Sequence, residues 1–120
     1  MPARKLPAVD LPSLPERPRC GVILDGPSTG WMQLAMGEWE LEGSFFEDEH
    51  PFDEVNYVLK GQLVVSCDGE QLELGPGESV HVPGGSSARY DAPVYARMVY
   101  VYGPNPTGAP SRVIDEGSIS

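Results

Sequence analysis

The residues best suited to chemistry lie in one stretch, 43–61, where carboxylate and imidazole side chains recur at alternate positions. Asp48 and His50 are two residues apart, and Glu54 and Asn56 repeat that spacing. In an extended chain, side chains two residues apart leave the same face. A cavity between strands could therefore hold all four. Imidazole next to carboxylate can place an acid beside a base or bind a divalent ion.

The same residues allow three interpretations. His50 and Glu54 can act as an acid/base pair that Asp48 tunes, with no cofactor. Alternatively, His50, Glu54 and Asp48 can ligate one divalent metal ion, for which the carboxylates would favour a hard ion. The third interpretation is a solvated acidic loop, 47–49 and 53–54, that carries one exposed histidine. The spacing alone leaves all three open.

Five further residues are candidates for binding and orienting a small substrate: Asn56, Tyr57, His81, Arg89 and Tyr100. His81 alternates with two valines, so it enters the pocket only if those valines face away from it. If the valines face in, His81 lies on the surface. Tyr57 and Tyr100 can equally pack within a sheet, and Arg89 can pair with a surface carboxylate.

Short strands must position these residues. Segments rich in β-formers, separated by turn signals, predict strands at 22–24, 31–41, 55–59, 62–67, 71–74, 79–82, 88–90 and 94–102. Asp68-Gly69 predicts a two-residue hairpin, because both turn positions require positive φ. The 14 glycines and 13 prolines are too many for a helical bundle but typical of tight turns. We expect an all-β barrel or double-sheet jelly roll.

A length of 120 residues fits one domain. We expect an extended Pro-rich arm over 1–20, a β-barrel over 21–104 and a loose tail over 105–120. Proline fixes φ and lacks an N–H, so the arm cannot form a helix or a central strand. Exposed sheet edges, together with an arm that could cross to another subunit, predict a homodimer.

Charge and composition narrow the function classes. The chain has 18 acidic and 8 basic residues and a formal charge of -10, which repels phosphate backbones, so no nucleic-acid partner is expected. No apolar run approaches the roughly 20 residues of a membrane helix, and no apolar block follows the first basic residues as in a secretory signal. Cys20 and Cys67 lie in no CxxC motif and predict free thiols in a reducing compartment. We expect a cytoplasmic protein that binds a small molecule.

Two motifs resemble those of the cupin superfamily. Gly43, Asp48-x-His50, Glu54 and Gly61 follow the spacing of the first cupin motif, in which a glycine precedes His-x-His, Glu and a second glycine. The frame from Gly77 through the next acid to Pro83 matches the second motif. The resemblance covers about 43–90 and implies a small double-stranded β-helix with one pocket. Where cupins have their first and last metal-binding histidines, this chain has Asp48 and Ala88.

Within the cupins, the chain is similar to the ethanolamine-utilisation Q-type group. Segments 53–61, 80–87 and 99–104 carry the likeness, above all the Gly-Ser-Ser at 85–87. That group also lacks the usual histidine set. The resemblance implies an association with bacterial microcompartments and an acetate kinase activity. A GxxxxGK[ST] phosphate-binding motif does not occur in the sequence.

Together these observations predict an acid/base enzyme that uses Glu54 and His50 on a small polar molecule. Isomerisation, dehydration, cyclisation and decarboxylation are the reactions open to such a pair. Two alternatives stay open: a non-catalytic ligand-binding or scaffold domain, and a divalent-metal cupin enzyme. In a binding domain, the pocket carboxylates would select a cationic ligand such as an amine.

Overall fold

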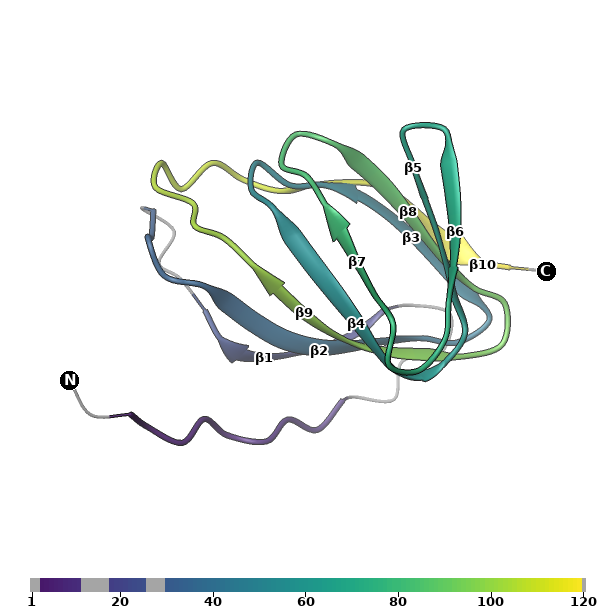
Figure 1. Ribbon diagram of the computed structural model, residues 1–120, viewed down its shortest axis with the longest axis horizontal. Helices are drawn as coiled ribbons and strands as arrows, with labels where there is room; N and C mark the ends of the chain where they lie inside the picture. The colour runs from purple at the N-terminus through teal and green to yellow at the C-terminus, as the bar shows by residue number, and fades with distance from the viewer. Residues whose placement is uncertain (1–2, 12–17, 26–29, 120) are drawn as a thin grey trace.

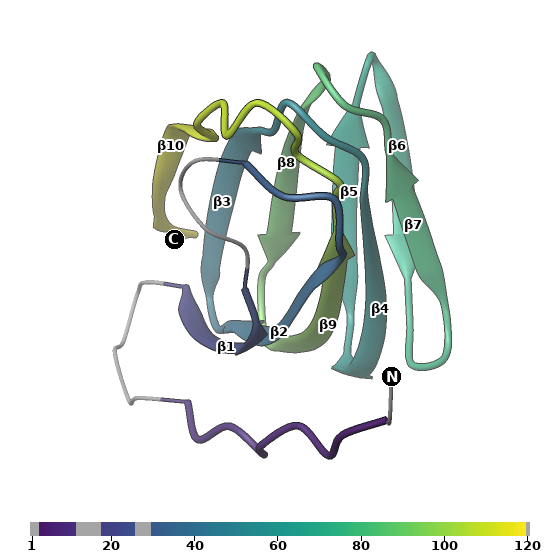
Figure 2. The same ribbon diagram turned by 90° about the vertical axis from the view of Figure 1, so that its left-hand side faces the viewer.

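Ten antiparallel strands form two five-stranded sheets in the computed structural model, which describes residues 3–11, 18–25 and 30–119. The first sheet has the order β1 (Arg19–Leu24), β2 (Ala35–Leu41), β9 (Ala96–Tyr102), β4 (Glu54–Gly61) and β7 (Ser79–Val82). The second has the order β10 (Arg112–Ser118), β3 (Ser44–Glu49), β8 (Ser87–Ala92), β5 (Leu63–Cys67) and β6 (Glu70–Leu74). The two sheets face each other and enclose the core (Figure 1; Figure 2). The expected all-β, double-sheet architecture is confirmed.

Alternation along the strands decides which side chains enter the space between the sheets. On β4, Glu54, Asn56 and Val58 are buried, whereas Val55 and Tyr57 are exposed. The core combines aliphatic residues with Trp39, Tyr90 and Tyr100. A strand with one buried and one exposed face follows this period of two. Glu54 and Asn56 are polar residues on this buried face, and they therefore indicate a candidate functional site.

Turn chemistry ends the strands where the sequence predicts it. β5 and β6 pair antiparallel from Cys67 opposite Glu70, so Asp68 and Gly69 form the two-residue loop. Their φ angles are 50° and 78°, both in the left-handed region, and the predicted hairpin is confirmed. At the end of β4, Gly61 has φ 81°, and an added Cβ would lie 2.0 Å from the Tyr95 carbonyl oxygen. Glycine is required there because the two backbones nearly touch.

The C-terminal segment differs from its prediction as a loose tail over 105–120. β10 pairs with β3 along most of its length, from Arg112 opposite Glu49 to Ser118 opposite Ser44. Trp31 and Asn105 form an additional bridge near the start of this segment. Its Gly, Pro and Ser content is typical of loops. Backbone pairing with the free edge of β3 overrides that composition because it satisfies an otherwise unpaired row of amide groups.

The N-terminal arm lies partly outside the described residues, since 12–17 and the first two residues belong to the undescribed part. Residues 3–11 contain no strand or helix and run alongside β1 (Figure 1). A Cβ added at Gly21 would lie 2.8 Å from the Cβ of Val9, so the arm packs directly on this glycine. The arm is shorter than expected, because β1 already begins at Arg19.

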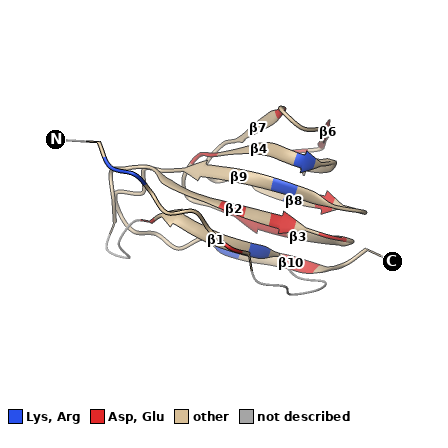
Figure 3. Ribbon diagram, turned by 90° about the horizontal axis from the view of Figure 1, so that it is seen from below, with Lys and Arg blue, Asp and Glu red and all other residues tan. Residues whose placement is uncertain are grey.

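The basic residues of the strands lie singly, and a further basic pair, Arg4 and Lys5, lies on the N-terminal arm (Figure 3, blue). Arg19 pairs with Glu40 at 2.9 Å, Arg97 with Glu38 at 3.2 Å, and Arg112 with Glu49 at 3.2 Å. These cations are neutralised locally, so the excess of acidic groups governs the field around the molecule. Among the described residues, no helix is long and apolar enough to cross a membrane. The absence of a nucleic-acid partner and the cytoplasmic location stay predictions.

Candidate active site

One histidine lies between two carboxylates on the inner surface of the barrel. The Nε2 atom of His50 is 2.9 Å from Asp48 Oδ2 and 3.3 Å from Glu54 Oε2. The side chains of His50, Asp48 and Glu54 are only 14 %, 11 % and 7 % exposed. The structure therefore brings together the three residues that the spacing singled out, and the solvated acidic loop is not what is observed there. We call Asp48, His50 and Glu54 the triad.

Elements from both sheets build the triad. Asp48 is the inward residue near the end of β3, opposite Ala88 of β8. Glu54 begins β4 of the other sheet, between Tyr102 and Val82. His50 belongs to the connection between these two strands. Ala88, which stands where the cupin resemblance has a histidine, is buried in the core.

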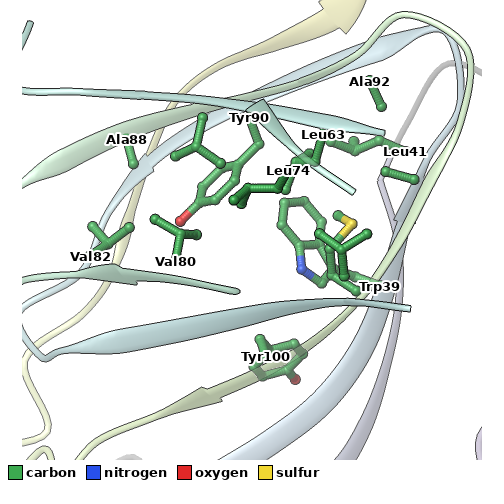
Figure 4. Close-up of a cluster of buried hydrophobic side chains, with 14 residues drawn as sticks. Trp39, Leu41, Leu63, Leu74, Val80, Val82, Ala88, Tyr90, Ala92 and Tyr100 are labelled. Atoms are coloured by element: carbon green, nitrogen blue, oxygen red, sulfur yellow. The ribbon is translucent and has the colours of Figure 1, made fainter. Parts of the chain in front are cut away.

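Glu54 is held by three donors. Its Oε1 accepts hydrogen bonds from Asn56 Nδ2 and the Tyr90 hydroxyl, both at 2.9 Å, while Oε2 contacts His50. Asn56 is fixed in turn, because Trp39 Nε1 donates to its Oδ1 at 2.8 Å. Figure 4 shows the Tyr90 hydroxyl directed toward the interior between the sheets. Both oxygens of Glu54 are thus engaged by protein groups.

The second oxygen of Asp48 is different. Asp48 contacts His50 through Oδ2, and within the described part of the chain no hydrogen bond reaches its Oδ1. Burial raises the pKa of Asp48, an effect that the hydrogen bond and charge of His50 oppose and the charge of Glu54 reinforces. Asp48 is therefore the triad's accessible carboxylate.

His50 is held in its charged form. Burial alone would lower its pKa, but hydrogen bonds and charge attraction from Asp48 and Glu54 outweigh burial and raise the pKa to about 10. Its Nδ1 lies 2.5 Å from Ser111 Oγ, just before β10. The ring stacks on Phe52 at 4.8 Å and on Tyr102 at 5.6 Å between centroids. Both ring nitrogens of the imidazolium are thus engaged.

Aromatic side chains wall a cavity of about 180 Å³ around the triad. Its lining, among the described residues, consists of Pro18, Cys20, Trp39, Phe46, Asp48, His50, Glu54, Tyr90, Tyr100 and Tyr102. Tyr100 and Tyr102 stack at 5.1 Å with an interplanar angle of 11°. Burial raises the pKa of Tyr102 to about 12 and that of Tyr100 further, so both phenols stay protonated near neutral pH.

Glycine 37 makes room for this wall. Gly37 of β2 lies opposite Tyr100 of β9, and an added Cβ would lie 2.4–2.5 Å from atoms of the tyrosine ring. The ring can therefore lie across the neighbouring strand only because position 37 has no side chain.

Of the five residues proposed to bind substrate, two lie at the site. Tyr100 lines the cavity, and Asn56 supports Glu54 from behind. Tyr57, His81 and Arg89 lie outside it, which corrects their expected place. The reason is alternation: Val80 and Val82 face the core (Figure 4), so His81 points outward and pairs with Asp53 at 3.0 Å. Arg89 pairs with Asp91 at 2.9 Å, and Tyr57 is 44 % exposed.

Sequence reasoning does not single out several residues of the site. The sequence pattern treats Tyr90, Tyr102, Phe46 and Phe52 as ordinary strand or loop residues, and Cys20 as a free thiol. Tyr90 carries the largest role, because its hydroxyl binds Glu54 from 36 positions away in the chain. The sequence signal for Tyr90 is that it shares one face of a strand with Ala88, and this pattern is equally typical of core packing. Burial and the charge of Glu54 strongly raise the pKa of Tyr90, so it acts as a donor.

The donor set does not fit a metal ion as it stands. Within the described residues, no group of three or more His, Cys, Asp or Glu side chains is arranged to hold one. Both carboxylates instead approach the same nitrogen of His50, and its other nitrogen faces Ser111. A metal would have to displace the proton that these contacts share.

Two facing antiparallel sheets with a polar site on their inner surface are the arrangement seen in the cupin fold. The structure of a cupin-superfamily protein from Desulfitobacterium hafniense is similar to this chain, with a TM-score of 0.64. The match covers 75 % of this chain and 80 % of that one at 14 % identity, so it shows a likeness of fold.

The chain belongs to the EutQ family. The family model described as "Ethanolamine utilisation protein EutQ" matches residues 18–107. The chain is similar to the acetate kinase EutQ of Clostridioides difficile, with 33 % identity over 69 residues, 58 % of this chain and 44 % of that one. The C. difficile EutQ structure matches with a TM-score of 0.64 at 27 % identity, covering 74 % of this chain and 64 % of that one. The matched segment spans less than half the length of that curated relative.

Proposed function

We propose that the chain is an acid/base enzyme of lyase or isomerase type acting on a small polar molecule. The observation that supports this most is the shared contact of His50 Nε2 with Asp48 and Glu54 at 2.9 and 3.3 Å inside a largely aromatic cavity. Burial of these groups strengthens the electrostatic interactions between them, which favours proton transfer between positioned groups.

The contacts suggest different roles for the two carboxylates. Glu54 uses both oxygens on protein donors, so we assign it the role of the anchor that keeps His50 charged and oriented. Asp48 has an accessible oxygen and a pKa raised by burial, which suits a general base. In the proposed step, Asp48 removes a proton from one atom of the substrate and returns it to another, while the charge of His50 stabilises the developing negative charge. The two carboxylates thus exchange the roles expected from the sequence, where Glu54 forms the acid/base pair with His50 and Asp48 tunes that pair.

The site gives little support to phosphoryl transfer in this chain. The curated relatives are named acetate kinases. Phosphoryl transfer depends on cations that stabilise the charge of the transferred group. No Lys or Arg is among the described residues that line the cavity. We therefore place the proposed chemistry in proton transfer.

Proton exchange in heavy water tests the proposal against pools of candidate substrates. The protein is incubated in D₂O with small amines, amino alcohols, hydroxy acids and keto acids, and proton NMR records deuterium incorporation or conversion. We expect wild-type protein to exchange or convert at least one compound. Asp48→Asn and His50→Gln should lower that rate by at least about a hundredfold, in line with general acid–base catalysis.

Asp91→Asn is the matched control, because Asp91 pairs with Arg89 on the outer face of the barrel. Its rate should equal that of the wild type. Saturation-transfer signals without any exchange would instead favour the non-catalytic binding domain. Elemental mass spectrometry of untagged protein tests the alternative of a divalent-metal enzyme. About one equivalent of a single ion in the wild type, absent from His50→Ala, would overturn the metal-free proposal.

A further inference from the structure

The hydrogen bonds within the triad leave an acceptor free for a ligand. Tyr90 and Asn56 both donate to Glu54, and Trp39 donates to Asn56. His50 is engaged at both ring nitrogens. Among the described residues at this end of the cavity, the polar atom left without a partner is Asp48 Oδ1. A ligand with N–H donors would meet an accessible acceptor there, whereas the donors left to an anion are the phenol groups of Tyr100 and Tyr102 farther along the wall.

The net charge of the triad also favours a cationic ligand. Two carboxylates surround one imidazolium, so the charged triad carries one excess negative charge in a cavity where no described Lys or Arg compensates it. A cation entering the cavity would balance this charge. The formal charge of -10 on the whole chain also raises the local concentration of cations.

The walls consist largely of aromatic rings. Tyr100 and Tyr102 form a nearly parallel stack, and Trp39 packs edge-on against Tyr90 with an interplanar angle of 83°. Aromatic faces attract organic ammonium ions, most strongly where water is excluded. A cavity of about 180 Å³ admits only a small ligand of this kind.

We infer that the cavity binds a small organic ammonium ion, with its N–H groups on Asp48 Oδ1 and its carbon atoms against the aromatic wall. This inference names the ligand class of the site described under the proposed function and rests on that site. It separates the chain from an anion-binding role such as the recognition of acetate.

Three matched probes test the ligand class: propylammonium, propanol and butanoate, together with acetate. Their binding is measured by calorimetry and by NMR titration of the Trp39 indole N–H signal. We expect propylammonium to bind at least tenfold more tightly than propanol, with butanoate and acetate not detected. Tetramethylammonium, which has no N–H, should bind more weakly than propylammonium but more tightly than propanol if the ring faces contribute.

Two variants and a control locate the site. Asp48→Asn should weaken propylammonium binding about tenfold, and Tyr102→Leu should weaken tetramethylammonium binding by a similar factor. Asp53→Asn changes an exposed carboxylate that pairs with His81 outside the cavity and should leave both affinities unchanged.

The two proposals fail in different ways. Tighter binding of butanoate or acetate than of propylammonium would overturn the ammonium inference, as would no difference among the probes. Asp48-dependent proton exchange could still support the enzyme in that case. Conversely, ammonium binding without proton exchange on any compound would uphold the inference and overturn the catalytic proposal.

Discussion

At the scale of single residues, the site depends on how unequally the protein treats two neighbouring carboxylates. Glu54 is surrounded by Asn56, Tyr90 and His50, whereas Asp48 has only His50 on one oxygen. A carboxylate that accepts from three side chains is held in one orientation. One that keeps an oxygen accessible can exchange a proton or receive a ligand.

The Tyr90→Phe substitution should show how much the anchor of Glu54 contributes. Loss of the hydroxyl removes one donor from a buried carboxylate, so we expect the free energy of unfolding to fall by about 1–3 kcal/mol. Urea titration measures this change. Tyr57→Phe is the matched control, because Tyr57 is exposed on the outer face, and its effect should stay within about 0.5 kcal/mol. Equal effects of the two variants would contradict the anchoring role.

The charged state of His50 predicts how stability depends on pH. Its pKa rises from the ordinary 6.5 to about 10 on folding, so the folded protein binds one more proton than the unfolded chain between these values. Its contribution is fully present below pH 6.5 and is lost as the pH rises through about 10. The slope should reach about 1.4 kcal/mol per pH unit.

Urea titrations from pH 6 to 10 on wild type and His50→Gln isolate this contribution. Other groups titrate in both proteins, so the difference between the two curves reports His50. The difference should narrow as the pH rises. A difference that stays constant across the range would show that His50 is not charged in the folded protein.

At the scale of elements, a glycine on β2 decides where an aromatic ring of β9 can lie. Gly37→Ala would bring a methyl group within 2.4–2.5 Å of Tyr100 ring atoms, so the ring must leave its place in the cavity wall. Overpacking of this kind costs about 1–3 kcal/mol. Thermal unfolding should show lower stability, and the Trp39 indole N–H signal should shift as the neighbouring wall rearranges.

Gly75→Ala provides the control for this prediction. Its nearest neighbour to an added Cβ is the end of the flexible Gln62 side chain at 3.2 Å, and its φ is not in the left-handed region. Stability should therefore change little. Wild-type stability in Gly37→Ala would mean that Tyr100 packs elsewhere.

At the scale of the whole molecule, the outer face of the first sheet leaves apolar side chains in water. Val55, Tyr57 and Leu59 of β4 are 39 %, 44 % and 37 % exposed. Contiguous apolar surface of this kind is typical of an interface between subunits. The expected homodimer is therefore more readily explained by this face than by the strand edges considered from the sequence.

Light scattering tests the dimer. Wild-type protein should have twice the 13.0 kDa chain mass, and Tyr57→Glu should shift it to the monomer by placing a charge in the interface. Leu72→Glu, at an equally exposed position on β6 of the other sheet, should leave the mass unchanged. A monomeric wild type, or a Tyr57→Glu dimer, would contradict this placement.

The sequence by itself predicted eight of the ten strands, all except β3 and β10, and the hairpin at Asp68-Gly69. It also placed Asp48, His50 and Glu54 at a spacing that allows them to share one cavity. Each depends on neighbours a few residues apart, where the period of two and the turn residues act directly. The cupin motifs extended this local information to the fold, and the EutQ likeness was confirmed.

Only the tertiary structure decided what surrounds the triad. Tyr90 reaches Glu54 from a strand of the other sheet, Ser111 reaches His50 from the segment before β10, and His81 points outward. Alternation requires that neighbouring side chains on a strand point to opposite faces, but it does not say which face is inside. That choice depends on how the two sheets pack, because burial of Val80 and Val82 in the shared core turns His81 to the solvent.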